Sequence, residues 1–159
     1  FEIAIAKIKD KKYDLIICNG MMHEVEDPDN FLKLINRLLS IKTKVYINVP
    51  NSNSLHRLLA LRMGLLNSLK DKSYRNIKLN QITNFDKKSL TDIVYKNIPN
   101  VVIDKCTSFF IKPFTHDQML KSLETKIIDM NVIEALYLVS DYFPEYGSEL
   151  YCLFSKSNN

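Results

Sequence analysis

Apolar residues at helical spacing open the chain, and a short apolar run follows them. The helical spacing over 1–9 is that of Phe1, Ala4, Ile5 and Ile8. Residues 13–18 (YDLIIC) are nearly continuously apolar, which predicts a parallel strand covered on both faces. The run ends at Asn19-Gly20, where the backbone can turn sharply. This pattern predicts a helix and then a strand.

A second helix is predicted from Asp27-Pro28, because aspartate caps a first turn and the fixed φ of proline suits it. Residues 44–49 (KVYINV) predict a second strand, which Pro50-Asn51 ends. After Ser52 or Ser54, a leucine-rich helix is predicted over 55–66. Leucines at this spacing favour a core or dimer contact, and a lid over a substrate is the alternative. The apolar stripe of the second helix is Phe31, Leu34, Ile35, Leu38 and Leu39.

The rest of the chain continues the alternation. Residues 67–85 are polar and irregular, and we expect a surface loop or lid there. Asp86 is expected to begin a helix. Residues 101–111 are expected to form a strand, which its length suggests is bent or bulged. Capping patterns at 115–118 and 131–134 predict two further helix starts, and 149–155 a last strand.

Strands that alternate with helices predict an α/β fold in one domain over 1–159, with three layers and helices on both faces of the sheet. In such sheets, ligands bind beyond the carboxyl ends of the strands. The segments 19–27 and 50–57 follow the first two strands and are rich in polar residues. We therefore expect the functional site there.

Two motifs carry a resemblance to a known family. The sequence YDLIICNGMMHEVEDP at 13–28 resembles the fourth strand and following loop of class I, Rossmann-like, S-adenosylmethionine-dependent methyltransferases. The sequence NVPNSNSLHRLL at 48–59 is similar to an element of their small-molecule and sugar-type group, which occurs in bacterial surface-glycan gene clusters. The segments 109–114, 117–119, 144–145 and 149–151 are similar to the C-terminal strands of that group, so the resemblance covers nearly the whole chain.

The chain departs from this family in its glycines. Only Gly20, Gly64 and Gly147 occur, so neither a GxGxxG nor a GxxxxGK loop is present. The family's first strand, glycine-rich loop and ribose-binding acid would lie before Phe1. The resemblance thus implies a partial methyltransferase domain, from the fourth strand onward, with the N-terminal strands missing and one sheet edge exposed.

By resemblance, the loop after the first strand lies along S-adenosylmethionine. The residues expected to bind this cofactor are Asn19, Gly20, Met21 and Glu24. His23 is a candidate catalytic base, because imidazole titrates near neutral pH. The alternative is that His23 makes a structural hydrogen bond and Glu24 anchors the loop.

A second set of polar residues, Asn51, Ser54, His56 and Arg57, follows the second strand. Arg57 could bind a phosphate or carboxylate of the substrate, together with Asn51 and Ser54. His56 is the second candidate catalytic residue. Alternatively, Asn51 and Ser54 are turn and cap residues and Arg57 is a surface ion-pair partner. The resemblance alone adds Lys112 as a substrate-binding residue at the mouth of the site.

Composition narrows the partners. The net charge of +4 comes from scattered lysines, so we expect a solvated surface and no nucleic-acid partner. The apolar runs are far shorter than the roughly 20 residues that span a bilayer, and no membrane partner is expected. Cys18, Cys106 and Cys152 lack CxxC spacing, which favours reduced thiols in a cytoplasmic protein and no metal site.

Three functions follow as hypotheses. The first is S-adenosylmethionine-dependent methylation of a small acceptor, a sugar or glycan precursor, by the complete protein, with this chain alone inactive. The second is a non-catalytic methyltransferase-like module that forms a homodimer or scaffold through the 55–66 helix and the sheet edge. The third, an NAD-dependent oxidoreductase, needs the same missing glycine loop and has no motif here.

Overall fold

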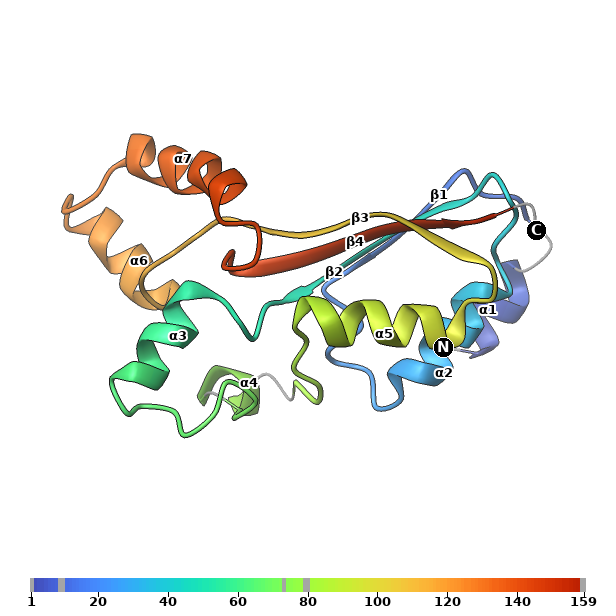
Figure 1. Ribbon diagram of the computed structural model, residues 1–159, viewed down its shortest axis with the longest axis horizontal. Helices are drawn as coiled ribbons and strands as arrows, with labels where there is room; N and C mark the ends of the chain where they lie inside the picture. Colours follow the sequence, from blue (N-terminus) through green and yellow to red (C-terminus); the bar gives the residue numbers. More distant parts are fainter. Residues whose placement is uncertain (1, 9–10, 73, 79–80, 158–159) are drawn as a thin grey trace.

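The computed structural model describes residues 2–8, 11–72, 74–78 and 81–157. Within them, four strands form one mixed sheet in the order β1-β2-β4-β3 (Figure 1). β1 is parallel to β2, whereas β4 is antiparallel to both of its neighbours. The strands are β1 (Leu15–Asn19), β2 (Lys44–Pro50), β3 (Val101–Phe109) and β4 (Glu149–Lys156).

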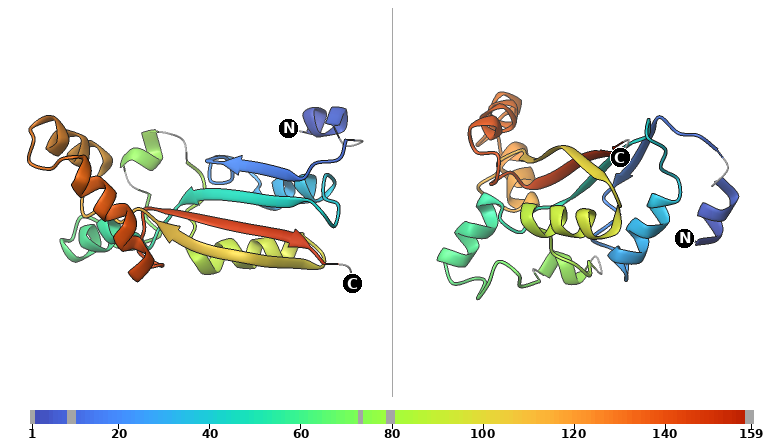
Figure 2. Two further views of the ribbon diagram at one scale, coloured as in Figure 1. Left: turned by 90° about the horizontal axis from the view of Figure 1, so that it is seen from above. Right: turned by 45° about the vertical axis from the view of Figure 1, so that its right-hand side comes forward.

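The helices divide into two groups. α1, α2 and α5 lie along one face of the sheet, and α3, α4, α6 and α7 gather beyond the end to which β1 and β2 point (Figures 1 and 2). None of the described helices is long and apolar enough to span a membrane. The bounds are α1 (Glu2–Ile8), α2 (Pro28–Asn36), α3 (Leu55–Arg62), α4 (Tyr74–Lys78), α5 (Lys87–Asn97), α6 (His116–Glu124), α7 (Met130–Leu138) and the 3-10 turn η1 (Val139–Tyr142).

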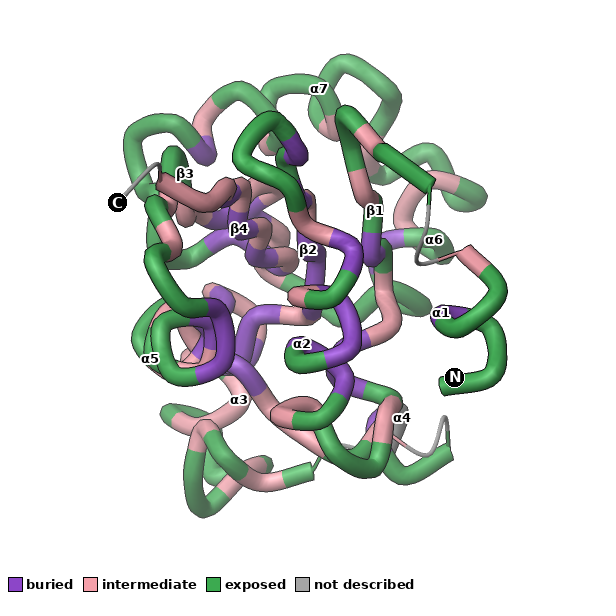
Figure 3. Tube along the Cα trace, turned by 90° about the vertical axis from the view of Figure 1, so that its right-hand side faces the viewer, coloured by how far each residue is buried: buried purple, intermediate pink, exposed green. Residues whose placement is uncertain are grey.

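The core lies between the sheet and the helices α2 and α5, where buried segments concentrate in Figure 3. Alternate residues of a strand point to the same face, so β2 presents Val45, Ile47 and Val49 to the helices. Facing them are apolar residues of α2 and α5. The main members on the helices are Phe31, Leu32, Ile35, Leu90 and Val94.

The opposite face of the sheet is open over β1. Leu15 and Ile17 are 51% and 61% exposed, while Cys18 on the covered face is buried. The prediction of a strand covered on both faces is therefore wrong for β1. In the described part of the chain, α1, α2 and α5 cover one face of this α/β sheet, and the expected helix layer on the other face is absent over β1. β1 is an edge strand here, paired with β2 alone.

Most predicted helix starts are confirmed by their capping bonds. The side chains of Asp27, Asp86 and Thr115 accept hydrogen bonds from the first turns of α2, α5 and α6. The long strand β3 is irregular between Ile103 and Lys105, as expected. The start predicted at 131–134 is wrong, because Asp129 accepts from the Val132 amide and begins α7 earlier.

Two segments differ in detail from expectation. α3 ends at Arg62, four residues short of the predicted 66, and its one buried residue is Arg57. Its leucines are not core residues, since Leu59 is exposed and its other leucines are only partly buried. The segment 67–85 contains the short helix α4.

Candidate functional site

The loop after β1 leaves the sheet beside β2. Asn19 pairs with Asn48, and the Gly20 amide donates to the Asn48 carbonyl at 3.1 Å. Gly20 has a φ of +65°, and a Cβ at this position would meet no atom within 4 Å. The backbone at Gly20 is thus open to a close neighbour, which is the use that glycine serves beside ligands. Met21 is half-buried at this turn, and Asn19 is exposed.

His23 is buried and tied to a segment far along the chain. Its carbonyl accepts from the amides of Ile82 at 2.8 Å and Thr83 at 3.2 Å. Its Nε2 lies 3.0 Å from the Gln81 side-chain nitrogen, which donates, so the ring proton sits on Nδ1. That Nδ1 has no partner among the described residues.

Burial lowers the pKa of His23, and the Glu24 carboxylate opposes this shift. Glu24 Oε1 lies 3.6 Å from His23 Nε2 and is largely exposed. The imidazole is therefore neutral at pH 7. It can accept a proton at that pH only if Gln81 gives up its hydrogen bond to Nε2.

A chain of side-chain hydrogen bonds leads from His23 to Arg57. Asn76 donates to Gln81, and Arg57 Nη1 donates to Asn76 Oδ1 at 3.5 Å. Arg57 is 8% exposed, and its Nη2 donates to the carbonyls of Leu69 at 2.8 Å and Asp71 at 2.6 Å. This chain of bonds joins the loop after β1 and the helix α3 to the described residues of the following segment, namely Leu69, Asp71, Asn76 and Gln81.

Arg57 is thus a buried residue that hydrogen-bonds to the segment after α3. The alternative that it is a surface ion-pair partner is wrong. Burial lowers the pKa of its guanidinium, with the Asp71 charge opposing. Its donors bind carbonyl oxygens of the following loop, which is why its side chain points inward. A phosphate or carboxylate near Arg57 would interact mainly with its positive charge, because the guanidinium already donates hydrogen bonds to these carbonyls.

Asn51 and Ser54 occupy the turn between β2 and α3. Asn51 is 2% exposed, and its amide donates to the carbonyls of Glu145 and Gly147, both at 2.8 Å. This bonding is that of a turn residue. Ser54 precedes α3 without capping it, and its buried hydroxyl has no partner within the described ranges.

His56 lies in a positively charged surrounding. Burial, with the charges of Lys112 and Arg57, lowers the pKa of His56 to about 4. The charges of Arg57 and Lys112 therefore both act on His56. Among the residues described, no group of three or more His, Cys, Asp or Glu is placed to hold a metal ion.

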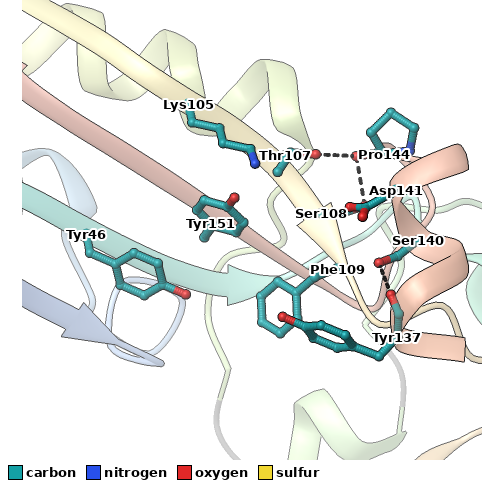
Figure 4. A pocket seen from close by; sticks show the side chains of 10 residues that line it. All are labelled: Tyr46, Lys105, Thr107, Ser108, Phe109, Tyr137, Ser140, Asp141, Pro144 and Tyr151. Atoms are coloured by element: carbon teal, nitrogen blue, oxygen red, sulfur yellow. Dashed lines mark hydrogen bonds between the residues drawn. The ribbon is translucent and has the colours of Figure 1, made fainter. Parts of the chain in front are cut away.

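Sequence reasoning missed Asn76 and Gln81, which connect the two predicted loops. Both lie in the polar segment expected to be a surface loop, where a buried amide leaves no sequence signal. It also missed a cavity of about 540 Å³ on the open sheet face. Figure 4 shows Tyr46, Tyr151 and Lys105 lining this cavity from three neighbouring strands. The centroids of the Tyr46 and Tyr151 rings are 5.6 Å apart, and the rings are stacked.

Comparison with known proteins decides the family. Residues 1–97, more than half of the chain, match the family model described as a methyltransferase domain. The chain belongs to this methyltransferase family. The matched part of the methyltransferase chain contains both loops described above, after β1 and after β2.

Solved methyltransferases are similar to this chain at low identity. PKMT2 from Rickettsia typhi in complex with AdoHcy is 15% identical, with 100% of this chain and 39% of that chain covered and a TM-score of 0.49. A SAM-dependent methyltransferase from Archaeoglobus fulgidus is 14% identical, with 98% and 64% covered and a TM-score of 0.49. One from Mesorhizobium loti is 10% identical, with 92% and 65% covered and a TM-score of 0.51.

The similarity to the Mesorhizobium loti protein supports the fold of this methyltransferase chain, but not a particular substrate or mechanism. The chain spans less than two thirds of the length of each of the three proteins. The search of curated proteins gave no match.

Proposed function

We propose that this chain is the part from the fourth strand onward of a class I S-adenosylmethionine-dependent methyltransferase, whose N-terminal strands complete the sheet beside β1. The complete protein methylates a small acceptor, a sugar or glycan precursor, in the cytoplasm. The observation that carries this proposal is the family match over residues 1–97, which includes the open turn at Gly20.

The cofactor would lie against the loop after β1, held by Asn19, Gly20, Met21 and Glu24. The fit rests on Gly20, because its backbone is open where a side chain would otherwise stand. S-adenosylmethionine supplies an electrophilic methyl group on a sulfonium. Two similar proteins support this cofactor, since the Rickettsia typhi structure is described with AdoHcy and a Haemonchus contortus phosphoethanolamine N-methyltransferase with S-adenosyl-L-methionine.

The acceptor would lie toward α3, where the charges of Arg57 and Lys112 act on His56. Methyl transfer is an in-line displacement, so alignment of the acceptor is the main task of the protein. The two cations favour an acceptor with an anionic group, such as a sugar phosphate. Lys112 would contact that group, and Arg57 would add its charge and hold the segment 67–81, while Asn51 and Ser54 shape the turn.

His23 and His56 are the candidate bases for the acceptor proton. Both pKa values are lowered, so both imidazoles are neutral near pH 7. Each also has a buried Nδ1 without a partner in the described part of the chain. The unpaired Nδ1 of neutral His56 can accept a hydrogen bond from an acceptor hydroxyl and orient it for attack. In His23 the unpaired Nδ1 carries the ring proton, so this residue would take up the acceptor proton at Nε2, after Gln81 gives up its hydrogen bond.

The cofactor site is tested by calorimetric titration with S-adenosylhomocysteine of the wild type, Gly20→Ala and Gly64→Ala. Both glycines have a positive φ and open space for a Cβ, so both substitutions carry a similar backbone strain. Only Gly20 lies in the proposed site. We expect at least tenfold weaker binding for Gly20→Ala and unchanged binding for Gly64→Ala. Equal affinities for the two variants would contradict the cofactor assignment.

A non-catalytic module that dimerises through α3 is the second candidate. The observation that favours it is the exposure of Leu59 (39%), Met63 (70%) and Leu65 (69%) on and just after this helix. Sedimentation velocity across a concentration series distinguishes the two. A dimer that Leu59→Glu dissociates, in a protein that does not bind S-adenosylhomocysteine, would favour the module.

A further inference from the structure

Two thiols face each other across the sheet, outside the proposed site. Cys106 of β3 lies directly opposite Cys152 of β4 in their antiparallel pairing. Directly opposed residues in such pairs have Cα atoms about 4.5 to 5.5 Å apart, which is within the range that disulfides span. The two side chains are hydrogen-bonded to each other. The pair can therefore be joined without moving the strands.

The environment makes the two thiols unequal. Cys152 is fully buried in the core, whereas Cys106 is partly exposed and packs against that core. The hydrogen bond from Cys152 lowers the pKa of Cys106, helped by the positive charge of Lys87, the first residue of α5, and opposed by burial. The same hydrogen bond and burial raise the pKa of Cys152. Reactive thiols are accessible and have a lowered pKa, which describes Cys106.

Cys18 is the natural reference for this pair. It is buried on β1, and burial raises its pKa to about 11. It also lies on a strand that does not pair with β3 or β4. The three cysteines thus differ in access and in ionisation, although the sequence around them gives no sign of it.

We propose that Cys106 and Cys152 form a reversible oxidation site whose substrate class is a hydroperoxide, with Cys106 as the reacting thiol and Cys152 as the resolving thiol. The Cys106 thiolate attacks one peroxide oxygen and the O–O bond breaks. That oxygen stays on sulfur as a sulfenic acid, and the other takes up a proton and leaves, as water for hydrogen peroxide. The Cys152 sulfur then attacks the Cys106 sulfur, the S–O bond breaks, and the hydroxyl of the sulfenic acid leaves as water with the Cys152 proton.

In this balance, the two thiols lose two electrons in total and the peroxide gains them. A small thiol reductant reverses the reaction by disulfide exchange. The disulfide would tie β3 to β4 and close the loop that carries α6, α7 and η1. The site is independent of the proposed methyltransferase function, so either can fail without the other.

The test treats the reduced chain with hydrogen peroxide, alkylates the remaining thiols after unfolding, and maps the peptides by mass spectrometry. We expect one intramolecular Cys106–Cys152 disulfide, with Cys18 alkylated. Cys152→Ser should stop at a Cys106 sulfenic acid that dimedone traps, Cys106→Ser should give neither product, and Cys18→Ser should behave as wild type. A disulfide to Cys18, or no linked peptide at all, would overturn the proposal.

A measurement on the wild type covers the case in which a serine variant does not fold. The folded, reduced chain is treated with iodoacetamide, and the alkylation of each cysteine is followed over time. Cys106 should react at least tenfold faster than Cys18. Equal rates for the two would show that Cys106 is not the reactive thiol, whatever the variants do.

Discussion

Single buried polar side chains carry much of the candidate site, and their protonation follows from their surroundings. His56 is the clearest case, because burial and two neighbouring cations all act against its charged form. Its pKa of about 4 in the folded chain lies well below the ordinary 6.5, which the unfolded chain keeps. The folded state therefore resists protonation that the unfolded state accepts.

The stability of the chain should consequently fall at acidic pH through His56. Its contribution is complete above pH 6.5 and is lost as the pH falls from 6.5 toward 4, because only the unfolded state binds the proton in that window. The loss is on the order of 3 kcal/mol. Urea unfolding at pH 7.5 and pH 4.5 should show a smaller loss for His56→Gln than for the wild type.

His116→Gln is the matched control, since His116 is exposed at the start of α6. It should lose as much stability as the wild type between the two pH values. Carboxylates titrate in the same window in all three proteins, so only the differences between them report on the histidines. An equal loss in His56→Gln and the wild type would contradict the partly buried, cation-flanked position of His56.

The role of a residue was predictable from the sequence where its hydrogen-bond partners lie close to it in the chain. Asp27, Asp86 and Thr115 cap helices because their partners lie three residues away in sequence. Arg57 was not predictable in its orientation, since its partners come from the loop after α3 and from α4. Asp129 was missed in favour of Asn131, because both residue types cap helices and the sequence alone does not rank them.

Among the elements, α3 positions the segment that follows it. It buries a charged residue, Arg57, and exposes much of its leucine surface. Through Arg57 it fixes the carbonyls of Leu69 and Asp71, and the Asn84 side chain donates to Lys70 and Asp71 carbonyls from the other side. The backbone of 69–71 is therefore held by side-chain hydrogen bonds from both sides.

Arg57→Met should loosen this segment selectively. Hydrogen bonds to a charged group contribute about 1.5 to 3 kcal/mol, so the variant should lose about 2 to 4 kcal/mol of unfolding free energy. Hydrogen exchange should rise in the peptides covering 67–72 and 81–84 and stay unchanged in β2 and β4. Arg62→Met, at an exposed position of the same helix, should change neither.

The opposite pattern would contradict the role of Arg57. If exchange rose uniformly across the sheet in Arg57→Met, or if Arg62→Met had the same effect, the segment 67–84 would not depend on the buried guanidinium. Urea unfolding gives the free energy of both variants.

The elements themselves were largely predictable, because apolar spacing and capping residues are local signals. All four strands and most helix starts were expected at their observed places. The coverage of β1 was not, since a run such as LIIC reads the same whether one face or both are packed. What packs on each face of a strand depends on the whole fold. In β1 nothing described covers the face that carries Leu15 and Ile17, so both side chains are exposed.

The whole molecule is a sheet with one packed and one open face. Ile47 of β2 is fully buried beneath the helices, whereas Ile17 of β1 is 61% exposed on the other side. The open face also carries the cavity of Tyr46 and Tyr151. The chain spans 65% of the length of the Mesorhizobium loti methyltransferase that it resembles.

The two faces should respond differently to the same substitution. Ile47→Thr removes buried apolar surface and buries a hydroxyl, which should cost about 2 to 4 kcal/mol. Ile17→Thr should change the unfolding free energy of this chain by less than about 0.5 kcal/mol. Denaturant unfolding measures both, and equal costs would show that the β1 face is covered.

The central claim is that the loop after β1 binds the methyl-donor cofactor, and an NMR titration of this chain with S-adenosylhomocysteine tests it most directly. The chain has three glycines, whose amide signals are readily distinguished. We predict that the Gly20 amide shifts progressively while that of Gly64, at the end of α3, stays in place. A ligand-dependent shift at Gly64 that spares Gly20 would contradict the claim.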